Sequence, residues 1–409
     1  MNASRARGFP LFWAGRTASQ FGDQITLLAL PWLIADATAS PLAVGALEAV
    51  AFAPMLLFGL PLGALADRRS RRRSMIEADV LRAILVASIP LTILFLDIGT
   101  SVALVLMITF FVGVGHALFE ASAQAFLTDL VPPDEIVRAN ARLSLTEGLA
   151  EVVGPATAGV LIAVLGATGA LAVDAATFAL SAVALIAVTR VRERYSIDTS
   201  RMRTAIREGL QIVTRQRRLR TLTLVIGGSN LGSGMVAGLI ILFMQRTIGL
   251  EGWGAGLVYA VNGVGGIAAS FVSQRLVHRF GISRTVLAGL TGAGAGFTLL
   301  AITTADWWFV TATTGMALIG LGVVTSFIAS ASLRQRIVPS ELLGRVTTSY
   351  RTVVNGAVAL GALTGGVVGE FVGVRVALLL GAGVYVSVTA VGFFTVLNSP
   401  DPPEIGEAV

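Results

Sequence analysis

The stretch Asp67-Arg68-Arg69-Ser70-Arg71-Arg72-Arg73 decides the fold, because it sets a dense cluster of arginines between two long apolar segments, 43–66 and 74–96. Such a cluster cannot lie in hydrocarbon, where one arginine at a helix centre costs about 2.5–3.5 kcal/mol. Arginine-rich loops stay on the cytoplasmic side of a membrane. The stretch is therefore predicted to be a cytoplasmic loop that joins two membrane-spanning helices.

The composition of the whole chain also indicates a membrane protein. Its 409 residues are 55% hydrophobic and only 13% charged, whereas soluble domains carry about 25% charged residues. A spanning helix needs roughly 20 apolar residues, so this length fits about twelve spans and an all-α membrane fold. The apolar pattern predicts helices over 11–35, 42–66, 74–96, 101–128, 142–165, 169–189, 221–245, 253–275, 284–304, 307–334, 346–370 and 375–397.

The distribution of arginines predicts the orientation. If the loop at 67–73 is cytoplasmic, alternation places nearly every loop arginine on the same side, and only Arg246 and Arg375 on the other. Both termini are then cytoplasmic in a multi-pass protein of the inner (plasma) membrane. The pI of about 10.8 does not indicate a nucleic-acid partner, because the charge is divided among loops and forms no single binding face. The expected partners are the lipid bilayer and a small-molecule substrate, with the chain working as a monomer.

The two halves of the chain repeat. Val131-Pro132-Pro133-Asp134 returns as Val338-Pro339-Ser340-Glu341, and at the same offset Gly154, Thr157 and Gly159 return as Gly361, Thr364 and Gly366. A shared offset indicates duplicated, pseudo-symmetric six-helix bundles. We expect a first bundle at 1–190, a basic cytoplasmic linker at 191–220 and a second bundle at 221–409. Within the linker, 204–214 has apolar residues at helical spacing, so it is either an amphipathic helix on the inner membrane surface or a solvated connection.

An ordered motif lies in the arginine loop. The residues that match G-x-x-x-D-R-x-x-R-R are Gly63, Asp67, Arg68, Arg71 and Arg72. This spacing resembles the loop signature of the major facilitator superfamily, a family of membrane transporters with the twelve-helix fold. A carboxylate at a helix end that pairs with arginines and a neighbouring helix N-terminus can latch one conformation.

Further residues bear on this latch. Arg138 and Arg142 offer extra partners, and Asp79 with Arg82 could join the same network. The alternative is that the loop only orients the chain, as any basic loop would.

Within the superfamily the chain resembles the drug:proton antiporter branch that includes macrolide-efflux proteins and the enterobactin exporter. The similarity is carried by Phe12 to Arg16 with Ser19 to Gln24, by Val131 to Glu135 with Arg138 to Asn140, and by Gly154 to Gly159. The last stretch resembles the antiporter motif G-x-x-x-G-P-x-x-G-G, with Ala150 and Ala158 in place of two glycines. Thr109 stands where many relatives carry an arginine, so a proton-coupling role for that arginine does not transfer to this chain.

Three carboxylates are predicted near mid-membrane. Asp23, Glu120 and Glu151 each lie roughly 13–18 Å from the cytoplasmic end of their helices, at about 1.5 Å per residue. A transporter needs a reason to keep such charges, and in this fold their helices border a central cavity. They could bind a proton and a cationic substrate in turn. Asp23 could instead be a structural hydrogen-bond hub with Gln20 or Gln24, and Glu151 could be satisfied inside its own bundle.

Two basic residues extend this set. His116 lies one turn before Glu120 on the same helix face, so the two could form a proton relay or one neutral hydrogen-bonded pair. Glu120 is the first choice for the proton carrier and Asp23 the second. Arg16 could pair with a carboxylate across the cavity, but the sequence favours an arginine that extends to the inner membrane surface.

The Gly154-Pro155 pair predicts a bend in its helix, because proline removes a backbone donor. Gly159 predicts close packing against another helix. The glycine clusters elsewhere do not indicate a nucleotide site, since they lie inside apolar helices and lack a lysine for phosphate.

The sequence predicts no enzyme, no metal site and no cofactor, and it contains no cysteine. The predicted function is secondary active export of amphipathic, drug-like molecules in exchange for protons, with the proton gradient as the energy source. The alternatives are a dedicated exporter of one metabolite, such as a siderophore or a self-made antibiotic, and a lipid flippase.

Overall fold

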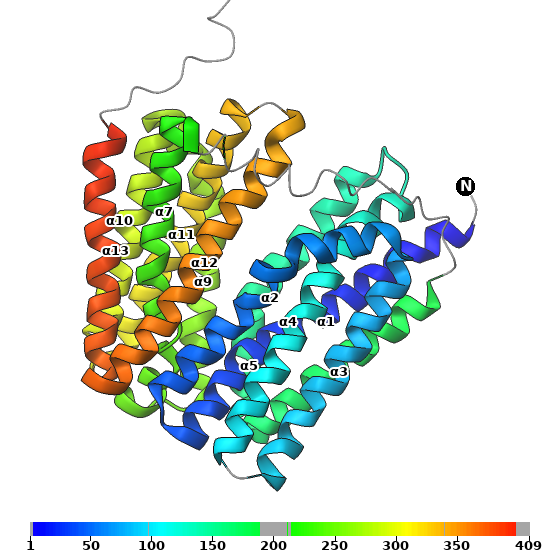
Figure 1. Ribbon diagram of the computed structural model, residues 1–409, viewed down its shortest axis with the longest axis horizontal. Helices are drawn as coiled ribbons and strands as arrows, with labels where there is room; N and C mark the ends of the chain where they lie inside the picture. Colours follow the sequence, from blue (N-terminus) through cyan, green and yellow to red (C-terminus); the bar gives the residue numbers. More distant parts are fainter. Residues whose placement is uncertain (1–2, 97, 189–210, 212–213, 339, 398–409) are drawn as a thin grey trace, which may run out of the picture. The chain divides into compact units, whose positions relative to one another are not determined.

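A computed structural model describes residues 3–96, 98–188, 211, 214–338 and 340–397, and every regular element in these ranges is helical (Figure 1). The first half contains α1 (Ala3–Thr38), α2 (Pro41–Arg68), α3 (Arg71–Phe95), α4 (Ile98–Leu130) and α5 (Ile136–Ala187). The second half contains α7 (Arg217–Ala237), α8 (Ile240–Leu242), the π-helix η1 (Phe243–Ile248), α9 (Gly252–Phe280), α10 (Ile282–Ala301), α11 (Trp308–Ile337), α12 (Ser340–Val372) and α13 (Val374–Leu397).

The long α5 holds two of the predicted spans. Its backbone leaves helical geometry at Gly166, where φ is 72° and ψ is 169°. Only glycine adopts this positive φ at little cost, so the chain can turn there and return as a second span. The stretch 204–214, predicted as an amphipathic helix or linker, lies almost entirely outside the described residues.

Eight helices of the described chain are long and apolar enough to cross a membrane. This number is reconciled with twelve predicted spans in two ways. First, α5 counts once although it contains two spans. Second, α1, α3 and α10 are not among the eight, and each carries at least one arginine, with Asp23 in α1 and Asp79 in α3. The fold is thus an all-α membrane architecture, as the sequence predicts, with polar residues concentrated in particular spans.

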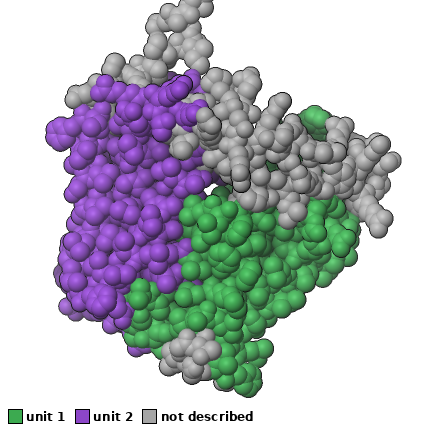
Figure 2. All heavy atoms as spheres, in the orientation of Figure 1, with its two compact units in different colours: residues 1–43, 50–199, 250–260 green, residues 44–49, 200–249, 261–409 purple. Residues whose placement is uncertain are grey.

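The chain divides into two compact units (Figure 2). The first comprises 1–43, 50–199 and 250–260, and the second comprises 44–49, 200–249 and 261–409. In the first unit α1 packs on α5, and α3 packs on both α4 and α5. In the second unit α7 packs on α12 and α13, while α10 packs on α11 and α13.

The core of the first unit is apolar at one end and polar farther along. Phe12 of α1 and Phe126 of α4 meet edge to face at 5.7 Å between ring centroids, within a buried cluster that includes Met75 of α3 and Leu185 of α5. Aromatic pairs of this geometry add to the stabilisation given by area burial. The cluster fixes α1, α3, α4 and α5 together, and it thereby fixes the polar side chains one to two turns away.

Small residues allow close helix packing in the second unit. A Cβ atom on Gly315 of α11 would lie 2.9 Å from the carbonyl oxygen of Gly296 in α10. Small residues at such crossings let two backbones approach, which is how membrane helices associate without a hydrophobic driving force.

Candidate functional site

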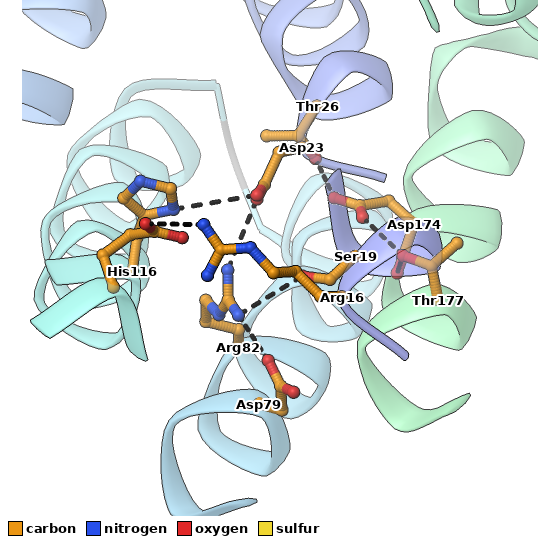
Figure 3. A network of polar contacts seen from close by, with 10 residues as sticks. Arg16, Ser19, Asp23, Thr26, Asp79, Arg82, His116, Asp174 and Thr177 are labelled. Carbon is orange, nitrogen blue, oxygen red and sulfur yellow. Dashed lines mark hydrogen bonds and ion pairs between the residues drawn. The ribbon is translucent and has the colours of Figure 1, made fainter. Parts of the chain in front are cut away.

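A buried arginine, Arg82 of α3, is the centre of a polar network in the first unit (Figure 3). Its side chain is 1% exposed and lies between the rings of Phe119 and Phe178, at 4.9 and 4.2 Å from their centroids. Gly115 of α4 makes room for it, because a Cβ atom there would lie 2.9 Å from Arg82 Cγ. Guanidinium groups stack on aromatic faces in this way, which helps them to remain charged away from water.

Two aspartates neutralise this arginine. Asp79, one turn earlier in α3 and fully buried, accepts a hydrogen bond from Arg82 Nη2. Asp23 of α1 lies with its Oδ1 3.4 Å from Arg82 Nη1, and the Ser19 hydroxyl lies 3.4 Å from Nη2. The network therefore holds two carboxylates on one cation, and Asp23 is the more accessible of the two, with 30% of its side chain exposed. The structure thus ties Asp79 and Arg82 to Asp23 of the candidate site, although the sequence suggested them as partners of the loop latch.

His116 lies against Asp23, with its Nδ1 3.7 Å from Asp23 Oδ2. Spacing in the sequence placed His116 beside Glu120, whereas the carboxylate that the structure pairs with His116 is Asp23. Glu120 points its Oε2 at Arg16 Nη2 at 3.0 Å, which leaves His116 to the carboxylate of α1. The network therefore brings an imidazole and a guanidinium to the same aspartate.

The favoured position of Arg16 is also corrected. Its guanidinium does not extend to the membrane surface but pairs with Glu120 of α4. An arginine inside a span is stabilised far better by a carboxylate than by lipid, and Glu120 is within reach because α1 and α4 are in contact. Glu120 is thus a neutralised group rather than a lone carboxylate.

Asp174 of α5 is a further buried carboxylate, absent from the residues singled out in the sequence. It is completely buried, accepts a hydrogen bond from the Thr26 hydroxyl of α1, and lies with Oδ1 3.1 Å from Thr177 Oγ1. The signal for it is plain in retrospect, because it is the lone acidic residue in the predicted span 169–189.

The other cavity candidates are more peripheral. Gln24 packs its Cβ against Gly154 of α5, where an added Cβ atom would lie 2.6 Å away. Gln20 Oε1 is buried and has no hydrogen-bond partner among the described side chains and backbone. Glu151 is exposed and lies outside the Arg82 network.

In α5, the helix continues through Gly154 and Pro155 and departs from helical φ and ψ only at Gly166. Gly159 packs on the start of α9, where an added Cβ atom would lie 2.6 Å from the Gly252 carbonyl oxygen. This stretch of the motif therefore serves close approach between backbones.

Two arginines of the loop motif bind other helices of the first unit. Arg71 forms an ion pair with Asp129 at the end of α4 and donates to the Ala125 carbonyl oxygen at 3.2 Å. Arg72 donates to the carbonyl oxygens of Leu185 and Ile186 at the end of α5, at 2.8 and 2.6 Å. A cation at a helix C-terminus is favourable because the last carbonyls lack partners and carry partial negative charge.

The remaining motif residues are less informative. The side chains of Gly63, Asp67 and Arg68 lie outside the described part of the structure, although their backbone belongs to α2. Arg138 is exposed, and the Arg142 guanidinium lies 6.0 Å from the ring centroid of Phe9. Asp129 is the anion that the sequence did not single out, and its place at a helix end beside the arginine loop is the signal that could have found it.

No group of three or more histidine or acidic side chains with metal-binding geometry occurs among the described residues. What the network can do is hold or release protons. Its members are carboxylates and an imidazole near a fixed guanidinium, inside a bundle of helices.

The fold and this site define a membrane transporter of the major facilitator type. Over residues 3–404 the chain matches the model of a family described as transmembrane secretion effector. The chain therefore belongs to this family of the major facilitator superfamily, whose members are transporters and not enzymes.

Individual relatives agree. The chain is 28% identical over 393 residues to the MFS-type transporter YfiS of Bacillus subtilis (strain 168), a match that covers 91% of this chain and 89% of YfiS. It is 26% identical to macrolide efflux protein A of Streptococcus pyogenes and 30% identical to the multidrug efflux pump Tap of Mycolicibacterium fortuitum. Each of these two matches covers about half of both chains. The match to macrolide efflux protein A covers 53% of this chain and 54% of that protein, and the match to Tap covers 55% of this chain and 56% of that protein.

Solved structures share the fold. A mutant form of the nucleoside transporter NupG superposes with a TM-score of 0.76 over 96% of this chain and 99% of that chain, at 12% identity. A bacterial homologue of the iron transporter ferroportin gives 0.74 over 94% and 99%, at 16% identity. At these identities the likeness concerns the fold alone.

Proposed function

We propose that this protein exports amphipathic small molecules in exchange for protons. The observation that carries the proposal is the position of Asp23, which lies between the buried Arg82 and the exposed His116. A carboxylate that is partly accessible can exchange a proton with water. Because it also faces a fixed cation, its change of charge alters the electrostatic balance inside the bundle.

The proposed cycle follows from the charges. When Asp23 is ionised it shares Arg82 with Asp79, and a cationic or polar part of a substrate can be held near it. When Asp23 takes a proton, Arg82 keeps Asp79 as its partner, so no buried cation is left unpaired, which would be costly. Protonation of Asp23 thus weakens the binding of substrate without destabilising the bundle. Alternating access then releases the substrate on one side of the membrane and the proton on the other.

The ion pair between Arg16 and Glu120 changes the order of candidate carriers. Glu120 already has a guanidinium at 3.0 Å, and releasing that arginine by protonation would leave a cation inside a span. Asp23 is therefore the first candidate and Glu120 the second. Glu151, exposed and apart from any cation in the described structure, is the third.

The substrate class rests on the efflux relatives, a macrolide exporter and a multidrug pump. Their names favour drug-like, amphipathic compounds, and one self-made metabolite of that kind would be exported by the same chemistry. No resident cofactor is part of this proposal, and the energy source is the proton gradient.

The setting of this activity is also part of the proposal. In this proposal the protein works as a monomer in the inner membrane, with both termini in the cytoplasm. Its two helical bundles are joined by the linker at 191–220. The loop motif from Gly63 to Arg72 would latch one conformation by tying α3 to α4 and α5.

The test is accumulation of substrate in inside-out vesicles or proteoliposomes with an acidic lumen, with a panel of drug-like cations and macrolides. Asp23→Asn should abolish gradient-driven export, while counterflow of substrate persists at a weaker affinity because the side chain has lost its charge. Glu120→Gln should retain gradient-driven export at a reduced rate. If both variants keep full proton-driven export, the coupling scheme is wrong, and Glu151, the third candidate carrier, must be tested in the same assay.

A further inference from the structure

Two carboxylates of the first unit share the buried Arg82, and a third, Asp174, lies close to them without a cation of its own among the described residues. Asp79 is paired directly with Arg82, and Asp23 lies 3.4 Å from it. Asp174 forms no ion pair among the described residues, and its neighbours are the hydroxyls of Thr26 and Thr177 (Figure 3). With all three ionised, the three carboxylates would outnumber the one guanidinium, although Asp79 and Asp174 are both fully buried.

Asp174 is also deep. It lies about 12 Å from Gly166 and about 20 Å from the Ala187 end of α5, at 1.5 Å per residue, which is near the middle of a hydrocarbon core of about 30 Å. An ionised carboxylate that is buried without a cation is much more costly than a neutral acid, and such a group takes up a proton instead.

The hydroxyl groups around Asp174 can satisfy the hydrogen bonds of a protonated, neutral carboxylic acid. Thr26 donates its hydroxyl hydrogen to Asp174 Oδ2. Thr177 Oγ1 lies 2.8 Å from the Asp174 carbonyl oxygen, to which it can donate, and 3.1 Å from Oδ1. A proton on Oδ1 can therefore be donated to Thr177 Oγ1, so both oxygens of the acid are satisfied.

We propose that Asp174 is a second proton-binding site, which holds a proton while Asp23 is ionised beside Arg82. Asp174 packs on the α1 backbone at Gly22, directly before Asp23, where an added Cβ atom would overlap its carboxylate. The charged or titratable groups of the network on the packed elements are Arg16 and Asp23 on α1, Asp79 and Arg82 on α3, and His116 and Glu120 on α4. Because Asp174 and Asp23 are like charges in one network, a proton on the first favours ionisation of the second.

The test is infrared spectroscopy of the full-length protein in phosphatidylcholine liposomes, without substrate. The wild type should show the C=O stretch of a protonated carboxylic acid near neutral pH, shifted in D2O. Asp174→Asn should remove this band. Asp23→Asn should keep it at mildly acidic pH and move its loss on alkalinisation to lower pH, because the like charge has gone.

Other results would overturn the proposal. These are the absence of the band in the wild type, or its loss in Asp23→Asn with retention in Asp174→Asn. If Asp174→Asn does not fold, Thr26→Val keeps every carboxylate and removes one donor, so it must shift the band, and an unchanged band counts against the site.

This site deepens the proposed proton antiport but is measured separately from it. A band that behaves as expected in a protein that shows no gradient-driven export would leave the proton site standing and remove the antiport. Gradient-driven export together with a missing band would leave the antiport standing and remove Asp174 as a proton-binding site.

Discussion

The carboxylate of Asp174 in α5 lies directly on the backbone of Gly22 in α1. A Cβ atom on Gly22 would overlap both the Asp174 carboxylate and the Thr177 hydroxyl, so a side chain as small as alanine has no room there. Gly22 is the residue before Asp23, and the close approach therefore connects a fully buried carboxylate, Asp174, with the partly accessible Asp23.

Gly22→Ala should consequently destabilise the protein by about 1–3 kcal/mol, the usual cost of overpacking a core, and should reduce export. The measurement is thermal unfolding of the purified protein in detergent together with transport in vesicles. The matched control is Gly148→Ala on α5, where an added Cβ atom meets nothing within 4 Å. Equal behaviour of the two variants would show that the approach of Asp174 to α1 is not as close as described.

Arg82→Lys should abolish export although it keeps the positive charge. The guanidinium serves Asp79, Asp23 and Ser19 at once and lies against two aromatic rings, whereas an ammonium is a compact charge that cannot fork or stack in this way. Export is measured at matched expression, with Arg69→Lys in the exposed loop as the control. Wild-type export by Arg82→Lys would mean that only the charge matters.

Asp129→Asn should destabilise the protein by about 3–5 kcal/mol, because it breaks the buried ion pair between Arg71 and Asp129. The side chains of this pair are only 10% and 5% exposed. Replacing both partners by apolar residues, as Arg71→Met with Asp129→Leu, should recover most of the loss.

The control for that pair is Glu77→Gln, which breaks the exposed pairs of Glu77 with Arg69 and Arg73. Surface pairs contribute about 0–1 kcal/mol, so this change should be nearly silent in the same unfolding assay. A large effect of Glu77→Gln, or none of Asp129→Asn, would contradict the assignment of Arg71 as the interior member of the loop.

The orientation of the chain can be tested because the protein has no cysteine. A single cysteine in place of Ser70 should resist an impermeant thiol reagent in intact cells and react after permeabilisation. Thr304→Cys, in the exposed turn between α10 and α11, should react in intact cells. The reversed pattern would invert the whole topology.

Much of the fold was predictable from local properties of the sequence. Apolar runs of spanning length locate helices, because lipid leaves the backbone no other partner than itself. Arginines in the loops predict orientation for an equally local reason, since short arginine-rich loops stay on the cytoplasmic side of the membrane. The two spans inside α5 are an example of helices located from apolar runs alone, and they are separated at Gly166, where glycine permits a positive φ.

The pairing of charges was not predictable in this way. Spacing along one helix placed His116 with Glu120, but the structure pairs His116 with Asp23 and Glu120 with Arg16. Spacing also could not show that Asp174, remote in sequence from α1, would lie on Gly22. Which side chains meet depends on how four helices rotate and approach one another, and that is set by packing of small and aromatic residues across the whole unit. The sequence by itself thus determined the spans, the family resemblance and the kinds of charge within the membrane, while only the tertiary structure decided which carboxylate faces which cation.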